Sequence, residues 1–415
     1  MRIVVMPIGS AGDVHPLVGV GKALQARGHE VVVVTNGYFG DLVRKAGLEF
    51  HALGSAEDYL KLAENPDLWH PRRAFATIFK GALNHAWAPT HALLRDLYRP
   101  GNTVLVAGTL GLAARNAHEA LGVPLVTVHL APSIFFSTYR APRFAGMFAP
   151  DWAPRWLKRA QFWAAGRLTD AVVLPALNRF RRELGLGPAR DIVRTWWHSP
   201  QRVLGLFPEW FGPPQPDWPP QTRLAGFPLF DEDGLREPPA GLEAFLAAGE
   251  PPVVFTPGTA MRHGTRFFTE AVRACELLGQ RGILLTQFAE TVPRDLPPSV
   301  AHFSYIPFSR VLPRAAALVS HGGIGTTAQA LRAGIPHLVQ HMAHDQMDNG
   351  SRLQDLGTGD MLPAGAFRAP RVARLLRGLL ESPAVAQAAR AIAARFAGTD
   401  PVGDACRIIE EAARG

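Results

Sequence analysis

A glycine-rich turn between an apolar strand and a helix constrains this chain most strongly. Residues 316–321 (AALVSH) predict a buried strand, and Gly322, Gly323 and Gly325 follow it directly. An Ala- and Leu-rich stretch then predicts a helix that ends at Gly334. In such a turn, backbone N–H groups and the helix N-terminus together favour a bound anion. The segment therefore predicts a phosphate site within a parallel α/β domain.

The same alternation of short apolar runs and helical stretches recurs in two blocks. The first block predicts strands at 2–8, 30–35, 103–108, 124–129 and 202–207. The second block predicts strands at 253–258, 282–287, 300–306, 316–321 and 336–341. Helical stretches such as 17–27 and 110–121 lie between the strands. Because alternating strands and helices form parallel, helix-covered sheets, the chain predicts two Rossmann-like α/β halves in tandem.

The composition fits two domains in a reducing compartment. The chain has 415 residues, 47% of them hydrophobic, which suits two cores of about 200 residues each. Cys275 and Cys406 are too few for a disulfide framework. The start lacks a signal peptide pattern, and no apolar run reaches the roughly 18 residues that span a membrane. We therefore expect a cytoplasmic protein.

The net charge of +8 favours anionic partners. An anionic substrate, an acidic acceptor or a membrane surface would all exploit this charge. Nucleic acid is not expected, because the chain carries no recognition motif or repeated basic helix. The first predicted turn, G-S-A-G-D-V-H-P (9–16), also lacks the G-x-G-x-x-G spacing of a dinucleotide site.

Several spaced residues resemble the nucleotide-sugar signature of the family 1 glycosyltransferases, which have the GT-B fold of two Rossmann-like domains facing across a cleft. The matching residues are His321, Gly322-Gly323, Thr326-Thr327, Gly334-x-Pro336 and Asp345-Gln346. The opening 9–16 resembles the N-terminal signature of that family, so the resemblance covers essentially the whole chain. The phrases at 196–201, 207–219 and 226–231 are most similar to the rhamnosyltransferase group of rhamnolipid synthesis. They also resemble related bacterial glycosyltransferases of lipids, sterols, polyketides and flavonoids.

The resemblance and the Pro-rich stretch at 213–220 together predict the domain organisation. We expect an acceptor-binding domain at 1–212, a linker at 213–225 and a nucleotide-sugar-binding domain at 226–398. The resemblance implies that a C-terminal helix at 399–415 packs back on the first domain. The sequence does not predict the oligomeric state.

The activity implied by the resemblance is an inverting, metal-independent hexosyl transfer. A nucleotide diphosphate sugar is the co-substrate, no cofactor is expected, and the acceptor is a hydroxyl on a small hydrophobic molecule such as a lipid, flavonoid or polyketide. Two alternatives remain open: a nucleotide-sugar 2-epimerase of the same fold, and a helper protein that has lost catalysis.

Asp13 and His15 are the candidates for the catalytic base that removes the proton of the acceptor hydroxyl. Asp13 is favoured because it occupies the position after the glycine where many relatives have histidine. A helix cap is the competing interpretation for Asp13, and a packing residue at the helix start is the competing one for His15. Relatives with a histidine base often have an orienting Asp after a later strand, whereas 106–110 here contains no carboxylate.

The remaining matches imply a donor site in the second half. The expected donor-binding residues are Ser10, Gly258, Thr259, Tyr305, Ile306, His321, Gly323, Thr326, Gln329, Asp345 and Gln346. By resemblance, Tyr305 stacks on the nucleobase, His321 donates to the diphosphate, and Asp345 and Gln346 hold sugar hydroxyls. The acidic run Asp231–Asp233 is interpreted as a solvated turn, so no metal site is expected.

Gln329 departs from the pattern of relatives that use UDP-sugars, which commonly have Glu there to hold both ribose hydroxyls. The deoxyribose of a dTDP donor has no 2′-hydroxyl and does not need this pair of hydrogen bonds. The departure favours a dTDP-sugar, rhamnose by resemblance, over UDP-glucose.

Aromatic residues in 69–87 and 134–165 favour a hydrophobic acceptor. The residues that we expect to line an acceptor site are Phe135, Phe136, Phe144, Phe148 and Trp152. Core packing is the competing interpretation for each of them. Alternatively, the tryptophans and basic residues of 152–163 predict an amphipathic surface that contacts anionic lipid at the inner face of the membrane.

Overall fold

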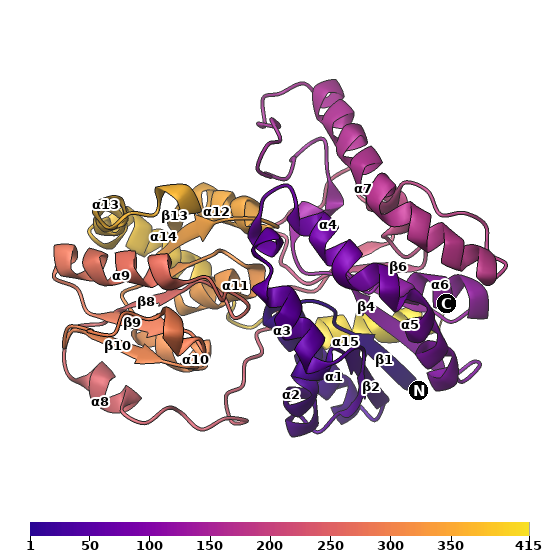
Figure 1. The fold of residues 1–415 in the computed structure, drawn as a ribbon, viewed down its shortest axis with the longest axis horizontal. Coiled ribbons are helices and arrows are strands. Elements are labelled where there is room, and N and C mark those ends of the chain that lie inside the picture. The colour runs from indigo at the N-terminus through magenta and orange to yellow at the C-terminus, as the bar shows by residue number, and fades with distance from the viewer. Residues whose placement is uncertain (415) are drawn as a thin grey trace. The chain divides into compact units, whose positions relative to one another are not determined.

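The computed structural model describes residues 1–414 and divides into two compact units. Unit 1 comprises residues 1–230 together with the C-terminal segment from Asp400, and unit 2 comprises Asp231–Thr399. Each unit contains one all-parallel sheet with helices between most successive strands (Figure 1). The predicted α/β architecture with two Rossmann-like halves is confirmed.

The sheet of unit 1 has the strand order β3-β2-β1-β4-β5-β6-β7. Its strands are β1 Arg2–Met6, β2 Glu30–Thr35, β3 Glu49–Ala52, β4 Thr103–Gly108, β5 Leu125–His129, β6 Arg202–Gly205 and β7 Thr222–Leu224. The central strands are continuous runs of Val, Leu and Ile that are almost fully buried, as expected where helices cover both faces of a parallel sheet.

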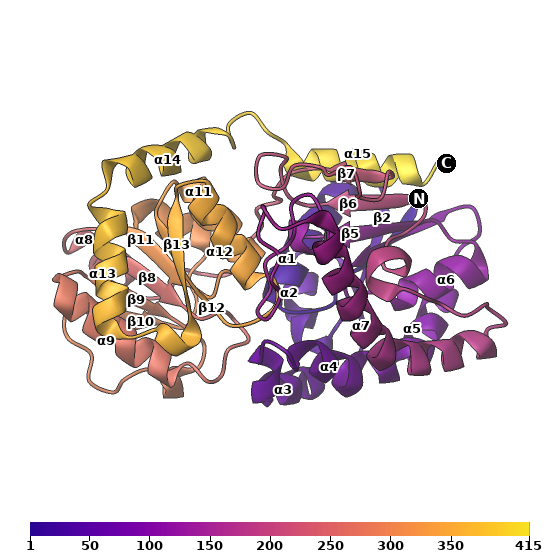
Figure 2. The ribbon, with the colours of Figure 1, turned by 90° about the horizontal axis from the view of Figure 1, so that it is seen from above.

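The helices of unit 1 cover this sheet. They are α1 Ala11–Ala26, α2 Gly40–Lys45, α3 Ala56–Glu64, α4 Ala74–Ile78, α5 Asn84–Leu97, α6 Ala113–Leu121, α7 Arg155–Glu183 and α15 Pro401–Ala412. The last of these packs against α1 (Figure 2). Glu410 accepts hydrogen bonds from Arg27 and His29 there, at 2.7 to 2.8 Å, which fixes α15 to unit 1.

The Pro-rich stretch that we predicted as a linker at 213–225 belongs to unit 1 instead. Trp218 stacks on Phe135 with ring centroids 4.2 Å apart. Asp217 accepts hydrogen bonds from the Ser137 hydroxyl and from the Thr138 backbone and hydroxyl, at 2.6 to 2.7 Å. The stretch then supplies the edge strand β7, a position where proline is tolerated because few backbone donors are needed. These contacts anchor the segment, so the chain leaves unit 1 only after Phe230.

The sheet of unit 2 has the equivalent order β10-β9-β8-β11-β12-β13. Its strands are β8 Val253–Thr256, β9 Gly282–Leu285, β10 Val300–Phe303, β11 Ala317–Ser320, β12 His337–His341 and β13 Gly359–Pro363. Its helices are α8 Leu242–Ala247, α9 Thr265–Leu278, α10 Phe308–Val311, α11 Ile324–Ala333, α12 Gln346–Asp355, α13 Ala369–Leu380 and α14 Pro383–Ala394. Among residues 1–414, none of the helices combines the length and apolar character needed to cross a bilayer.

Candidate functional site

The candidate donor site lies where three neighbouring strands of unit 2 end. Ser320 of β11 pairs with Thr256 of β8 on one side and with Val339 of β12 on the other. The loops that follow these strands therefore emerge together at the carboxyl edge of the sheet, where open α/β sheets bind ligands.

His321 follows β11, and its ring is enclosed by two glycines. A Cβ atom on Gly258 would lie 2.9 Å from the His321 ring, and a Cβ on Gly323 would lie 2.5 Å from His321 Nε2. Gly258 also has a φ of +102°, a conformation that side chains rarely adopt. Glycine is therefore required at both positions for the histidine to occupy its place at the start of α11.

Burial keeps the His321 imidazole neutral. Burial, together with a smaller effect of nearby His344, lowers the pKa of His321 to about 4. His321 Nδ1 is buried, and within residues 1–414 it has no hydrogen-bond partner. An unpaired polar atom beside a helix N-terminus is the arrangement expected where an anion is to be bound.

A buried hydrogen-bond network holds the glycine turn in place. The Ser320 hydroxyl accepts from the Gly322 N–H at 3.0 Å and lies 2.8 Å from His337 Nε2. Asn349 Nδ2 donates to the Gly322 carbonyl at 2.9 Å and to Asp345 Oδ2 at 2.7 Å. Sequence reasoning missed Ser320, His337 and Asn349. Of these contacts, only the one between Asn349 and Asp345 had a sequence signal, which is their i, i+4 spacing at the start of α12.

The two residues predicted to hold sugar hydroxyls differ in position. Asp345 is partly exposed at the start of α12. Gln346 is only 2% exposed, and its Oε1 accepts from the Met342 and Ala343 N–H groups at 2.7 and 3.1 Å. Gln346 therefore shapes the loop before α12, because its acceptor oxygen is already used.

Tyr305 and Ile306 follow β10, the edge strand of the sheet. Tyr305 is half-buried, and its hydroxyl accepts from the Glu232 N–H at 3.1 Å. The Arg236 guanidinium lies 4.7 Å from the centre of the Tyr305 ring, so a nucleobase would share the ring with this cation. Ile306 is buried, which leaves only its backbone for recognition.

The other predicted donor residues lie around the same edge. Thr259 is exposed after β8, and its carbonyl accepts from Gln287 at 3.1 Å. Thr326 and Gln329 are partly exposed on the first two turns of α11.

The acidic run after unit 1 has structural partners. Asp231 accepts from the Ser309 N–H at 2.9 Å at the start of α10, and Asp233 pairs with Arg310. Among residues 1–414, no group of three or more His, Cys, Asp or Glu side chains is arranged to hold a metal ion.

The candidate base Asp13 lies in the first turn of α1 in unit 1. Its Oδ2 accepts from the Ser10 N–H at 2.7 Å and from the Ser10 hydroxyl at 3.2 Å, so it closes the helix start as a capping box. Gly9 has a φ of +141°, and a Cβ there would lie 2.2 Å from Asp13 Oδ2. Ser10, which we grouped with the donor residues, therefore orients Asp13 within unit 1.

Burial raises the pKa of Asp13 to about 6, against the lowering effect of the Ser10 hydrogen bonds. A carboxyl group with such a pKa is mostly ionised at pH 7 and still accepts a proton readily. These are the properties of a general base near neutral pH.

His15 Nδ1 lies 2.8 Å from the Ala11 carbonyl, and because a carbonyl only accepts, this nitrogen carries hydrogen. The ring also packs beside Phe230. The Thr109 hydroxyl, in the segment where relatives have an orienting carboxylate, contacts His129 Nδ1 at 3.1 Å. His129 in turn contacts His198 at 3.0 Å, and this buried pair was not predicted.

The five aromatic residues predicted for the acceptor site separate into three environments. Phe135 is only 6% exposed and stacks between Trp218 and His198, so it belongs to the core. Phe136 and Phe144 pack against each other, with Phe162 beside Phe136. Phe148 and Trp152 are 58% and 77% exposed and face solvent.

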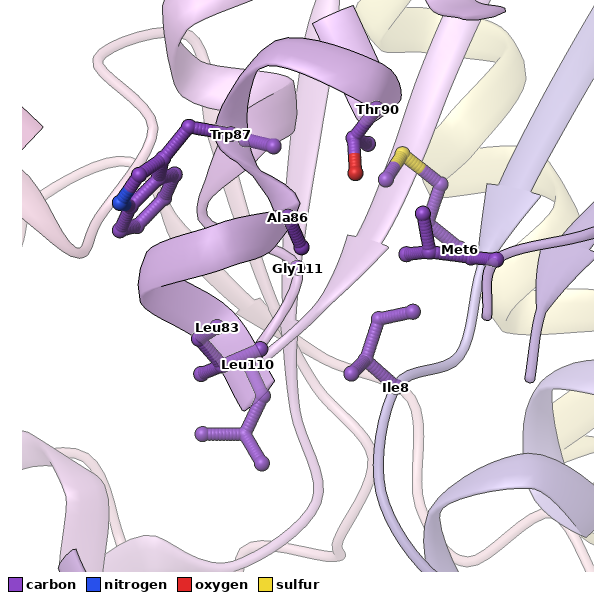
Figure 3. Close-up of a pocket in the computed structure, with 10 residues that line it drawn as sticks. Met6, Ile8, Leu83, Ala86, Trp87, Thr90, Leu110 and Gly111 are labelled. Atoms are coloured by element: carbon purple, nitrogen blue, oxygen red, sulfur yellow. The ribbon is translucent and has the colours of Figure 1, made fainter. Parts of the chain in front are cut away.

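A small apolar pocket opens at the carboxyl edge of the unit 1 sheet (Figure 3). Leu83 and Leu110 lie on one side of it and Ile8 on the other, with Thr90 above. The residues lining it are Met6, Ile8, Leu53, Leu83, Ala86, Trp87, Thr90, Leu110, Gly111 and Ala113. The Thr90 hydroxyl is buried and, among residues 1–414, has no hydrogen-bond partner. The pocket adjoins the Asp13 loop, since Ile8 directly precedes Gly9.

Comparisons with known proteins match both units. Residues 3–139 match the glycosyltransferase family 28 N-terminal domain, and residues 282–407 match the erythromycin biosynthesis protein CIII-like C-terminal domain. The chain is 31% identical to the O-mycaminosyltylonolide 6-deoxyallosyltransferase of Streptomyces fradiae, over 99% of this chain and 97% of that protein.

Solved structures share the fold. The glycotransferase of kitacinnamycin is similar with a TM-score of 0.75 at 20% identity, covering 99% of this chain and 98% of that one. Glycosyltransferase VinC, solved in complex with dTDP, is similar with a TM-score of 0.69 at 20% identity, with full coverage of both chains.

Proposed function

The chain belongs to the family 1 glycosyltransferases of the GT-B fold and is a nucleotide-sugar-dependent enzyme, and we propose that it transfers a 6-deoxyhexose from a dTDP-sugar to a hydroxyl of a hydrophobic acceptor. The observation that carries the proposal is His321 between Gly258 and Gly323 at the start of α11, whose buried Nδ1 has no hydrogen-bond partner among residues 1–414. A neutral imidazole N–H and the free backbone N–H groups of a helix N-terminus suit a diphosphate.

In the proposed reaction, Asp13 removes the proton of the acceptor hydroxyl as its oxygen attacks the anomeric carbon. The bond from that carbon to the diphosphate breaks, and the leaving dTDP takes the electron pair. His321 and the start of α11 stabilise the charge that develops on the diphosphate. Attack from the side opposite the leaving group inverts the anomeric centre. His15 is the alternative base.

The nucleotide preference rests on Gln329. A neutral amide makes a weaker contact with a ribose 2′-hydroxyl than the carboxylate found in relatives that use UDP-sugars, and a deoxyribose needs no such contact. The Streptomyces fradiae relative is named for transfer of a 6-deoxyhexose, which supports a deoxysugar donor. We favour rhamnose as that sugar and place UDP-glucose second.

We expect Gln329→Glu to improve UDP binding by about tenfold, because a new charge-assisted hydrogen bond to ribose is worth roughly 1.5 kcal/mol. The affinity for dTDP should change less than twofold. Calorimetric titration of the variant and the unmodified chain with UDP and dTDP measures the change in each Kd. Equal effects on UDP and dTDP would show that residue 329 does not contact the ribose.

The acceptor proposal rests on the apolar pocket beside the Asp13 loop. Its lining is apolar except for Thr90, whose buried hydroxyl would orient one polar group of the acceptor. The stretch 69–87, rich in aromatic residues, supplies Leu83, Ala86 and Trp87 to this lining. These features favour a lipid, flavonoid or polyketide acceptor.

Ala86→Phe should fill the pocket and raise the KM for the acceptor by on the order of tenfold, since a lost apolar contact area costs about 1 to 3 kcal/mol. The Kd for dTDP should be unchanged. Ala388→Phe, at a partly exposed position on α14, is the matched control and should leave both constants unchanged. A normal acceptor KM in Ala86→Phe would place the acceptor elsewhere.

Product analysis tests the proposed function. The enzyme is incubated with dTDP-rhamnose or UDP-glucose and a panel of a flavonol, a sterol, a macrolide aglycone and a 3-hydroxyalkanoic acid. Release of dTDP together with a glycosylated product supports the proposal. Conversion of the donor in the absence of any acceptor would support the 2-epimerase, and nucleotide binding without turnover on any acceptor would support the inactive helper.

A further inference from the structure

An exposed aromatic surface in unit 1 has no role in the proposed reaction. It consists of Phe148, Trp152, Trp156, Trp163 and Leu168, which we call the tryptophan face. Their exposed fractions run from 58% to 77%, values that are unusual for large apolar side chains. Figure 1 shows α7, which carries three of them, rising beyond the other elements of unit 1. An exposed group of this size indicates an interaction site.

The tryptophan face has a fixed geometry. Trp156 and Trp163 are seven residues apart on α7 and therefore lie on the same side of the helix. The helix is anchored in unit 1 through Phe162, which is 3% exposed, and farther along through Asp170, which accepts from the Ile192 N–H at 3.0 Å. The helix therefore has a defined outer face.

The loop before α7 is tied to the helix as well. Gln161 exchanges two hydrogen bonds with the backbone of Phe148, at 2.6 and 2.9 Å. The buried Lys158 donates to the Asp151 carbonyl at 3.0 Å, which holds the turn that carries Trp152. Phe148 and Trp152 pack edge to face, with ring centroids 5.6 Å apart. Loop and helix together form one organised surface.

The charges around this surface are positive. Arg159 and Arg167 are exposed on the side of α7 that carries Trp156 and Trp163, whereas Arg155, exposed at the helix start, stacks on the Tyr139 ring. The nearby carboxylates do not offset them, since Asp151 pairs with Arg143 at 3.8 Å and Asp170 is buried. Arginine beside tryptophan is the combination that binds the headgroup region of anionic bilayers, where tryptophan rings prefer the interface.

We propose that the tryptophan face docks the enzyme on an anionic lipid surface. Tryptophan and phenylalanine insert at the level of the headgroups, and Arg159 and Arg167 contact lipid phosphates. A second copy of the chain fits this surface less well, because a two-fold contact would bring the same arginines of both copies together. The proposal does not depend on which sugar or acceptor the enzyme uses.

Vesicle flotation with the full chain tests the docking. The probes are vesicles of equal parts phosphatidylglycerol and phosphatidylcholine, and vesicles of phosphatidylcholine alone. We expect binding to the anionic vesicles at least tenfold stronger than to the neutral ones, and weaker binding in 1 M NaCl because salt screens the arginines. A blue shift of tryptophan emission should accompany binding.

Two paired variants separate the apolar and electrostatic contributions. Trp156→Ala with Trp163→Ala should lower the partition coefficient by on the order of tenfold. Arg159→Glu with Arg167→Glu should lower it by about a hundredfold or more. The matched control, Arg371→Glu with Arg374→Glu on the exposed side of α13, changes the net charge equally and should have a much smaller effect. All six sites are exposed, so melting temperatures should be retained.

Equal binding to anionic and neutral vesicles, equal effects of the two arginine pairs, or no vesicle binding would overturn the proposal. A concentration-dependent dimer in analytical ultracentrifugation that is lost in the tryptophan variant, without vesicle binding, would assign the face to a second copy. Binding of an acidic protein but not of lipid would likewise contradict lipid docking.

Discussion

Asp13→Asn is expected to lower kcat by about 10²- to 10⁴-fold, the range for loss of a positioned general base. The affinity for dTDP should be unchanged, because Asp13 belongs to unit 1 and the nucleotide residues belong to unit 2. For the unmodified enzyme, kcat/KM should fall as the pH drops through about 6, since only the ionised carboxylate accepts a proton and burial raises the pKa of Asp13 to about 6. Steady-state kinetics between pH 4.5 and 8.5 measure both effects.

Thermal stability separates a base from a helix cap. The pKa of Asp13 is raised in the folded state, so between about pH 4 and 6 the folded chain holds more protons than the unfolded chain, and stability falls as the pH rises. Asn carries no charge and avoids this cost, so Asp13→Asn should be more stable by about 1 to 2 kcal/mol at pH 8 and equal to the unmodified chain near pH 4. Retained turnover together with lower stability at pH 8 would identify Asp13 as a cap only. A larger loss of activity in His15→Ala would identify His15 as the base.

His321→Ala should lower kcat by about 10²- to 10³-fold, because it removes a preorganised donor to the leaving diphosphate. The pH dependence assigned to Asp13 should persist in the residual activity. The measurement is single-turnover release of dTDP under saturating donor. Normal turnover in this variant would show that the imidazole does not contact the diphosphate.

Gly323→Ala provides an independent control on the geometry. Gly323 has an ordinary φ of −61°, so alanine is conformationally allowed there, and the added methyl group meets His321 Nε2. Gly323→Ala should therefore lower kcat by much of the factor expected for His321→Ala. The double variant should have a kcat close to that of His321→Ala alone. Additive losses would mean that Gly323 acts through something other than the imidazole.

Much of the fold followed from the sequence because the buried strands are continuous runs of branched apolar residues. All ten predicted strands lie within the two observed sheets. The three missed strands, β3, β7 and β13, lie at sheet edges, where exposure dilutes the apolar pattern. The linker prediction at 213–225 was wrong because proline content does not reveal that Trp218 and Asp217 make tertiary contacts.

The site residues were predictable where backbone geometry demands a residue type. Gly258 and Gly323 had to be glycine beside His321. The glycine turn after the predicted strand 316–321 pointed to His321 and Gly323, and the family resemblance pointed to Gly258. Roles that depend on burial could not be predicted from the sequence. Gln346 could in principle hold a sugar hydroxyl, but its Oε1 accepts from a loop backbone N–H group. Phe135 could in principle contact an apolar acceptor, but the rings of His198 and Trp218 enclose it. The Ser320–His337 and Asn349–Gly322 contacts join residues from different elements, so no local pattern signals them.

Calorimetric titration of the unmodified chain with dTDP, UDP and GDP tests the central claim most directly, because it measures the nucleotide site without requiring the acceptor. We predict that dTDP binds, that UDP binds several-fold more weakly because Gln329 replaces the ribose-binding carboxylate, and that GDP does not bind detectably. Tighter binding of UDP than of dTDP, or no binding of any of the three, would contradict the proposed dTDP-sugar transferase.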